Sequence, residues 1–125
     1  MENKYQFSKS ASNSASGSRA NAFPVSEKFC MTEKVQYAEG SVVSKIIIRN
    51  ERGNVTLFAF DKGEFLSEHT APFDAIVQIL DGVGQVVIDG QSFNLSLGES
   101  IIMPANVRHS VHAIEQFKML LTMIK

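Results

Sequence analysis

The sequence predicts an all-β fold of antiparallel strands, and two observations support this prediction. About nine short segments are rich in β-branched and aromatic residues, and turn-forming residues separate them at intervals of about ten residues. No segment shows the spacing of apolar residues that an amphipathic helix requires. Short strands at this spacing are typical of a sandwich or a barrel, and periodicity alone does not decide between the two.

The expected strands follow one another from residue 42 to the C-terminus. The first two, 42–49 and 55–60, flank a polar, glycine-containing loop at 50–54, which predicts a hairpin. Asp89 and Gly90 lie between two further strands, and this dipeptide predicts a two-residue type I′ turn. The remaining expected strands are 65–70, 75–80, 85–88, 92–95, 100–103, 109–113 and 115–124.

The N-terminal part has a different composition from the rest of the chain. Serine occupies every second position from Ser8 to Ser18, and such a tract can bury almost no apolar surface. We therefore expect residues 1–21 to be a flexible, serine-rich tail. Residues 22–125 are expected to form one domain, because a chain of 125 residues holds a single hydrophobic core.

The composition of the chain limits the partners that it could bind and the cellular compartment in which it is expected. The formal net charge is −1, so the chain lacks the basic surplus that attracts proteins to nucleic acid. Apolar runs are far shorter than the ~20 residues that span a bilayer, so no membrane association is expected. The single cysteine, Cys30, cannot form an internal disulfide, which favours the reducing cytoplasm as the location.

Two sequence motifs resemble the signature motifs of the cupin superfamily. The first family motif has a glycine, five residues, His-x-His, three or four residues, a glutamate, six residues and a glycine; here residues 63–82 read GEFLSEHTAPFDAIVQILDG. The second has a glycine, five residues, Pro-x-Gly, two residues, a histidine, three residues and an asparagine; here residues 98–113 read GESIIMPANVRHSVHA. The positions that match are Gly63, His69, Gly82, Gly98, Pro104 and His109.

This resemblance chooses between the two β architectures. It implies an antiparallel double-stranded β-helix, the jelly-roll or cupin barrel, and the chain resembles small uncharacterised single-domain cupins of bacteria. It also implies that a metal site would lie inside the barrel, built from two histidines and the glutamate of the first motif and the histidine of the second.

Two departures from the motifs fall on these ligand positions. His69 and His109 stand where the first and last histidines are found in the family, whereas Ala71 and Ala75 replace the second histidine and the glutamate. Asn106 replaces the glycine of the second motif, and asparagine can adopt the same left-handed backbone conformation. The resemblance therefore implies a degenerate site with two histidines.

Three interpretations of this site stay open. The first is a small-molecule pocket that holds no metal, lined by His69, Ala71, Ala75, Val77, Met103 and His109, with two histidines on an apolar wall. The second is a metal-dependent enzyme of the oxygenase or isomerase type, in which His69 and His109 bind Fe, Mn, Ni or Zn together with an unidentified third ligand. Asp74 could be that ligand if a bulge turned it inward. The third is a pair of histidines at the edge of the core, hydrogen-bonded to each other or to water.

The last expected strand, 115–124, predicts a partner subunit. It carries apolar side chains on both faces, and only one face can enter the barrel. The other face needs cover, so we expect a homodimer, which is common among small cupins. The resemblance and the residues at the motif positions together imply a cupin barrel that binds a small molecule, with a metal-dependent enzyme as the alternative.

Overall fold

The computed structural model describes residues 23–125, so the expected serine-rich tail, residues 1–21, lies outside the described part of the chain. The described residues form nine strands and one short 3-10 helix, η1 (Met31–Glu33). Among them, no helix has the length and apolar character needed to cross a membrane.

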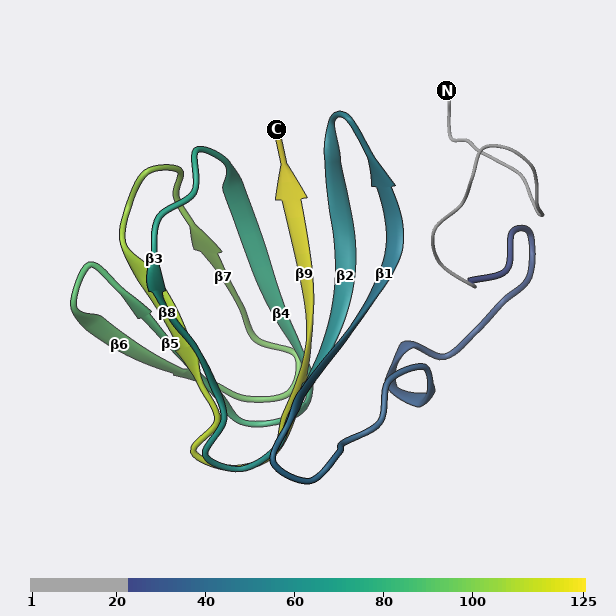
Figure 1. The fold of residues 1–125 in the computed structure, drawn as a ribbon, viewed down its shortest axis with the longest axis horizontal. Coiled ribbons are helices and arrows are strands. Elements are labelled where there is room, and N and C mark those ends of the chain that lie inside the picture. Colours follow the sequence, from purple (N-terminus) through teal and green to yellow (C-terminus); the bar gives the residue numbers. More distant parts are fainter. Residues whose placement is uncertain (1–22) are drawn as a thin grey trace.

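The strands form two sheets that face each other (Figure 1). The larger sheet has the order β1-β2-β9-β4-β7, with β1 Val42–Asn50, β2 Gly53–Phe60, β9 Phe117–Ile124, β4 Asp74–Gly82 and β7 Ser100–Met103. The smaller sheet has the order β3-β8-β5-β6, with β3 Phe65–His69, β8 His109–His112, β5 Gly84–Ile88 and β6 Gln91–Leu95. Neighbouring strands are antiparallel.

The predicted all-β antiparallel fold is confirmed, and each expected strand is present within a few residues of its predicted bounds. The turn between β5 and β6 has φ of 48° at Asp89 and 83° at Gly90. Two consecutive positive φ angles are characteristic of a type I′ turn, as the dipeptide predicted. Local turn chemistry therefore sets the register of this hairpin, in which Ile88 pairs with Gln91.

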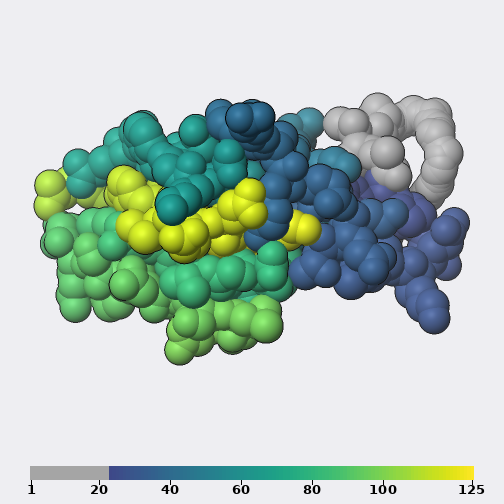
Figure 2. All heavy atoms as spheres, turned by 90° about the horizontal axis from the view of Figure 1, so that it is seen from below, coloured from purple at the N-terminus to yellow at the C-terminus, as the bar shows by residue number. Residues whose placement is uncertain are grey.

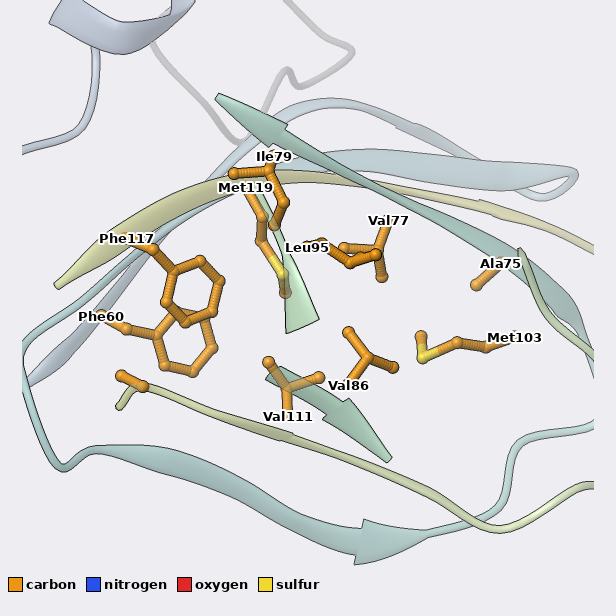
Figure 3. Packing of buried hydrophobic residues seen from close by; sticks show 11 residues of the cluster. Phe60, Ala75, Val77, Ile79, Val86, Leu95, Met103, Val111, Phe117 and Met119 are labelled. Carbon is orange, nitrogen blue, oxygen red and sulfur yellow. The ribbon is translucent and has the colours of Figure 1, made fainter. Parts of the chain in front are cut away.

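The main core fills the space between the two sheets (Figure 3). Alternate residues of each strand point inward, as period-2 geometry requires. Phe60 and Phe117, both fully buried, stack with ring centroids 4.6 Å apart. The other core residues include Val77, Ile79 and Met119 from the large sheet and Val86 and Val111 from the small one.

A second apolar cluster lies on the outer face of the large sheet. There Leu57 and Leu120 pack with the fully buried Val35, and the cluster also takes in Phe29 and Met31. These last three residues belong to the segment that precedes β1, which we call the lead-in segment (23–41). Figures 1 and 2 show it beside β1, at the opposite end of the molecule from β5 and β6.

The lead-in segment covers part of the outer face of β9, for which the sequence had predicted a partner subunit. The outward-facing Lys118 of β9 is buried, donates from Nζ to the carbonyl oxygen of Thr32 at 2.6 Å and lies over the ring of Tyr37 at 5.1 Å. Leu120, its neighbour on the same face, is buried as well. The chain itself therefore covers this half of the outer face of β9, where the sequence analysis had expected another subunit to be needed.

Candidate functional site

The site expected from the sequence lies where the two sheets diverge, at the end of the barrel where β3 stops and β4 begins (Figure 1). His69 of β3 and His109 of β8 are directly opposite each other in the β3–β8 register. Their ring centroids are 4.4 Å apart and the rings meet edge to face, at 68°. His109 is buried, whereas His69 is exposed to solvent. The structure thus brings together the two histidines that the motifs singled out.

A bulge in β3 gives His69 its inward direction. Leu66 pairs with Val111 and His69 with His109, so Ser67 and Glu68 together stand opposite the single residue Ser110. Strict alternation would place residues 66 and 69 on opposite faces, because their separation is odd. The extra residue of the bulge restores a common face, which is a known way to redirect a side chain next to a site.

Each histidine is held by one hydrogen bond to the backbone. The Nδ1 atom of His69 lies 2.8 Å from the carbonyl oxygen of Ser67, and that of His109 lies 3.1 Å from the carbonyl oxygen of Val107. A carbonyl oxygen can only accept, so both Nδ1 atoms carry hydrogen. In the neutral rings both Nε2 atoms therefore present a lone pair. This arrangement also means that two neutral rings cannot donate to each other through Nε2.

The two loops beside the histidines are tied together. In the β7–β8 loop, the amide of Asn106 donates to the carbonyl oxygen of Ala71 at 2.7 Å, and the amide of Ala105 donates to Asp74 Oδ1 at 2.8 Å. Asn106 has φ of 66°, the left-handed conformation expected when asparagine replaces the motif glycine. These contacts hold the ends of β3 and β8, and thus the two rings, in place.

The other expected pocket residues divide into two groups. Ala75, Val77 and Met103 are buried members of the main core on the inner face of the large sheet (Figure 3). Ala75 is paired with Met103 on β7 and with Met123 on β9, so two flexible thioether side chains flank it. Ala71 lies beyond the end of β3 and is partly exposed. The barrel wall next to the histidines is therefore apolar.

The described residues do not supply a third metal ligand of the usual kind. No group of three or more His, Cys, Asp or Glu residues within 23–125 is placed to hold a metal ion. Asp74 is exposed and accepts the hydrogen bond from Ala105, and β4 carries its bulge farther along, between Ile79 and Asp81. The hypothesis that a bulge turns Asp74 inward is therefore wrong.

The remaining polar residues near the motifs point away from the barrel. Glu68 lies 3.8 Å from the guanidinium of Arg108, which also donates to Asp89 Oδ1 at 2.9 Å. The hydrogen bond to Asp89 raises the pKa of Arg108 above its ordinary value, with smaller contributions from the charges of Glu68 and Asp89. His112 stacks on Phe65 and lies 2.9 Å from Ser110 Oγ through Nε2. Two imidazoles alone do not fit a cupin metal centre of the usual composition.

Sequence reasoning found both histidines but missed what positions them. The Asp74–Ala105 contact joins residues 31 positions apart, and no local pattern marks it. The backbone acceptors of the two Nδ1 atoms are likewise invisible in a sequence. A bulge could have been suspected only from the odd spacing between Leu66 and His69, two residues that both suit an inward position.

The chain is similar to a known protein family and to several solved structures. The profile of the cupin domain family matches residues 56–125. A conserved protein of unknown function from Streptococcus pyogenes is 29% identical with a TM-score of 0.78, over 86% of this chain and 97% of that one. A cupin superfamily protein from Desulfitobacterium hafniense is 25% identical with a TM-score of 0.78, over 86% of this chain and 98% of that one.

A third similar structure shares more of the sequence. It is a cupin 2 conserved barrel domain protein from Leptotrichia buccalis, 44% identical with a TM-score of 0.76 over 78% of this chain; the match covers only 47% of that protein. No curated protein sequence matches the chain. The family profile covers more than half of the chain, and the two sheets form the expected barrel. This chain therefore belongs to the cupin family.

Proposed function

We propose that this cupin binds a small organic molecule at the end of the barrel where His69 and His109 stand. One observation supports this proposal above the others. Both rings are fixed through Nδ1, so in the neutral state both Nε2 atoms are free to accept hydrogen bonds from a ligand. Binding sites typically combine apolar walls with a few such fixed polar groups.

The surroundings of the rings favour a particular kind of ligand. Ala75, Val77 and Met103 would contact an apolar body, while the two imidazoles would bind a group that can donate, such as a hydroxyl or an amine. Arg108 is bound to Asp89 on the outside of the barrel and does not offer a cation for a carboxylate. A neutral donor therefore suits the site better than an anion.

The alternative is a metal-dependent enzyme of the oxygenase or isomerase type acting on a small organic substrate. It is supported by the same hydrogen bonds, because metal-binding histidines usually donate their other ring nitrogen to a carbonyl or carboxylate group. Against it stands the donor set, which lacks a third ligand of the usual kind among the described residues. Fe, Mn, Ni or Zn would need a further ligand from the substrate or from solvent.

The experiment is a thermal-shift screen of metabolites on tag-free protein, repeated with His69→Ala. Because His69 is exposed, its removal should leave the fold intact. His112→Ala is the matched control, since this third histidine lies on the outer face of the same sheet, against Phe65. We expect the stabilisation by a hit to be lost in H69A and kept in H112A. Equal shifts in all three proteins would place the binding site elsewhere.

The metal alternative has its own readout. Elemental analysis after incubation with Fe(II), Mn(II), Ni(II) and Zn(II) should show well below one metal ion per chain if the first proposal holds. A stoichiometric metal that H69A loses and H112A retains would favour the enzyme instead.

We also propose that the protein works in the cytoplasm as a homodimer. Cys30 is free and exposed, which suits a reducing compartment. The dimer is supported by exposed apolar residues that the lead-in segment leaves uncovered on the large sheet, among them Ile48 and Ile102.

A further inference from the structure

The inner face of the large sheet changes from apolar to polar at its β1–β2 edge. On β9, β4 and β7, the row of inward-facing residues nearest the histidines is apolar and consists of Met123, Ala75 and Met103. The same row continues in direct register to Asn54 of β2 and Arg49 of β1. Thr56, the next residue of β2 on this face, is polar as well. We call Arg49, Asn54 and Thr56 the polar corner.

A bulge in β1 puts Arg49 on the inner face. Ile46 pairs with Thr56 and Ile48 with Val55, so β1 has one residue more than β2 in this stretch. Strict alternation from Ile46 would turn Arg49 outward, because the separation of the two residues is odd. The extra residue restores the pairing of Arg49 with Asn54 on a common face.

The polar corner lies at the same end of the barrel as His69. β3 follows β2 after a short link, residues 61–64, and runs in the opposite direction, so β3 ends where β2 begins. Figure 1 shows the β1–β2 turn and the end of β3 at this same end. Solvent reaches the inner face here, since Met119 of β9 is fully buried whereas Met123, closer to this end, is partly exposed. A ligand that enters beside His69 therefore meets the polar corner on the opposite wall.

The groups that the polar corner leaves free are hydrogen-bond donors. Thr56, only 7% exposed, donates from Oγ1 to Oδ1 of Asn54 at 3.1 Å. This contact identifies the other amide atom of Asn54 as Nδ2, which carries two hydrogens. Among residues 23–125, no acceptor is hydrogen-bonded to this Nδ2 and no carboxylate forms an ion pair with Arg49. One wall of the site thus presents donors and a positive charge, while the imidazoles on the other wall present acceptors.

We infer that the ligand of this cupin is a small hydroxy or amino carboxylate that bridges these two walls. Arg49 and Asn54 bind its carboxylate, and the imidazoles of His69 and His109 bind its hydroxyl or amine. The inference rests on the proposed function, which places a donor group of the ligand at the two Nε2 atoms. Hydrogen bonds from a guanidinium to a carboxylate are charge-assisted and are among the stronger ones in proteins. Arg49 supplies the positive charge that Arg108, outside the barrel, does not.

The dimensions and the wall between the polar groups restrict the ligand further. Packed sheets lie about 10 Å apart, and the side chains of His69 and Asn54 extend into this space from opposite sides. The space that remains suits a short carbon chain. Ala75, Met103 and Met123 line the apolar row beside it, and they would contact the carbon atoms of the ligand.

The first test compares three probes that differ in one group each. They are γ-hydroxybutyrate, its neutral amide γ-hydroxybutyramide, and butyrate, which lacks the hydroxyl. NMR titration of isotope-labelled, tag-free protein at constant pH measures each dissociation constant, with the imidazole protons of His69 and His109 as reporters of the location. We expect the hydroxy acid to bind about 5- to 10-fold more tightly than the amide, because only the acid offers a charge to Arg49. Butyrate should also bind more weakly than the hydroxy acid.

Substitutions of arginine show where the charge is recognised. Arg49→Met should remove the advantage of the acid over the amide and leave binding of the amide unchanged; the exposed position of Arg49 lets the fold tolerate this change. Arg52→Met is the matched control, since Arg52 is also exposed but lies in the β1–β2 turn, outside the paired row. It removes the same charge from the protein. We expect R52M to keep the wild-type preference.

A charge reversal tests the inference from the opposite direction. Arg49→Glu should bind the amino alcohol aminobutanol more tightly than γ-hydroxybutyrate, whereas the wild type should show the opposite order. Asn54→Asp keeps the shape of the side chain and adds a negative charge, so it should weaken the hydroxy acid as well. The same order of affinities in wild type and R49E would refute the polar corner as the carboxylate site.

The remaining outcomes separate this inference from the proposed function. Binding of the acid that H69A weakens, but that R49M leaves as strong as R52M does, would keep the histidine site and refute the polar corner. Binding that R49M weakens and H69A leaves unchanged would refute the bridge and count against the histidine site. If neither γ-hydroxybutyrate nor the shorter glycolate binds more tightly than its amide, the inference is overturned, while the metabolite screen still decides the proposed function.

Discussion

Tyr37 anchors the lead-in segment to the large sheet, and its hydroxyl should make the stability of the protein sensitive to alkaline pH. The hydroxyl donates to Asp81 Oδ2 at 2.6 Å, beside the Lys118 ammonium over the ring. Burial raises the pKa of Tyr37 far above its ordinary value, and the hydrogen bond to Asp81 and its negative charge add to the effect. Tyr37→Phe keeps the ring and removes only the titrating group.

The sign and size of the effect follow from the two protonation states. The pKa is higher in the folded protein, so the contribution to stability is complete below the unfolded pKa of about 10 and is lost as the pH rises above it. At pH 11 an unfolded tyrosine is mostly ionised, while Tyr37 in the folded protein keeps its proton. This difference in ionisation lowers the free energy of unfolding at pH 11 by about 1.4 kcal/mol. Because Tyr37 is only half-buried, screening by solvent reduces the loss to about 1 kcal/mol.

Urea denaturation at pH 9 and pH 11 measures the effect. At pH 9 we expect Y37F to be less stable than the wild type by about 1–1.5 kcal/mol, the usual value for a hydrogen bond to a charged acceptor that solvent partly reaches. At pH 11 the difference should shrink by about 1 kcal/mol. Asp81→Asn should show an intermediate pH dependence, because it keeps an acceptor but removes the charge. Parallel losses of stability in wild type and Y37F would show that the Tyr37 hydroxyl is not shielded as the structure indicates.

Three further predictions concern the core, acid stability and the loop beside the site. Gly84→Ala should cost about 1–3 kcal/mol in urea denaturation, because its Cβ would lie 2.6 Å from Cε2 of the buried Phe117; an unchanged midpoint would contradict this packing. The pKa of Asp61 is lowered, first by the hydrogen bond from the Gln116 side chain, so its contribution is complete above about pH 4 and lost as the pH falls through the lower folded value. Asp61→Asn should therefore flatten the acid limb of a stability–pH curve, and identical curves would refute the assignment. Asn106→Ala should cost about 1 kcal/mol at φ of 66°, whereas Asn106→Gly should not; equal midpoints would contradict the left-handed conformation.

The parts of the fold that local chemistry determines were predictable from the sequence. The Asp89-Gly90 turn needs only two residues with positive φ, and the strands need only alternation and β-branched side chains. The lead-in segment was not predictable in this way. Its cover of the outer face depends on Lys118 and Thr32, which are 86 positions apart and form a hydrogen bond that no local pattern encodes.

The candidate site shows the same division between local and long-range causes. The resemblance to the cupin motifs implied that His69 and His109 share a site in the barrel, and the structure places the two residues in direct register. The sequence could not predict that both Nδ1 atoms donate to the backbone two residues earlier, because that depends on the side-chain torsions of each ring. Those hydrogen bonds determine which lone pairs the rings would present to the proposed ligand, so the proposal depends on them as much as on the identity of the residues.

The bulge in β3 explains why the site and the outer surface of the small sheet stay separate. Phe65 and His112 form a stacked pair on the outer face, while Leu66 and Val111, one position farther along, point into the core. Continued alternation from Leu66 would bring Glu68 inward, opposite the apolar wall, and would turn His69 toward solvent. The extra residue instead leaves Glu68 outside, next to Arg108, and sets His69 against His109. A single inserted residue thus keeps a carboxylate out of the barrel and places two imidazoles side by side at its end, the pair on which the proposed ligand binding depends.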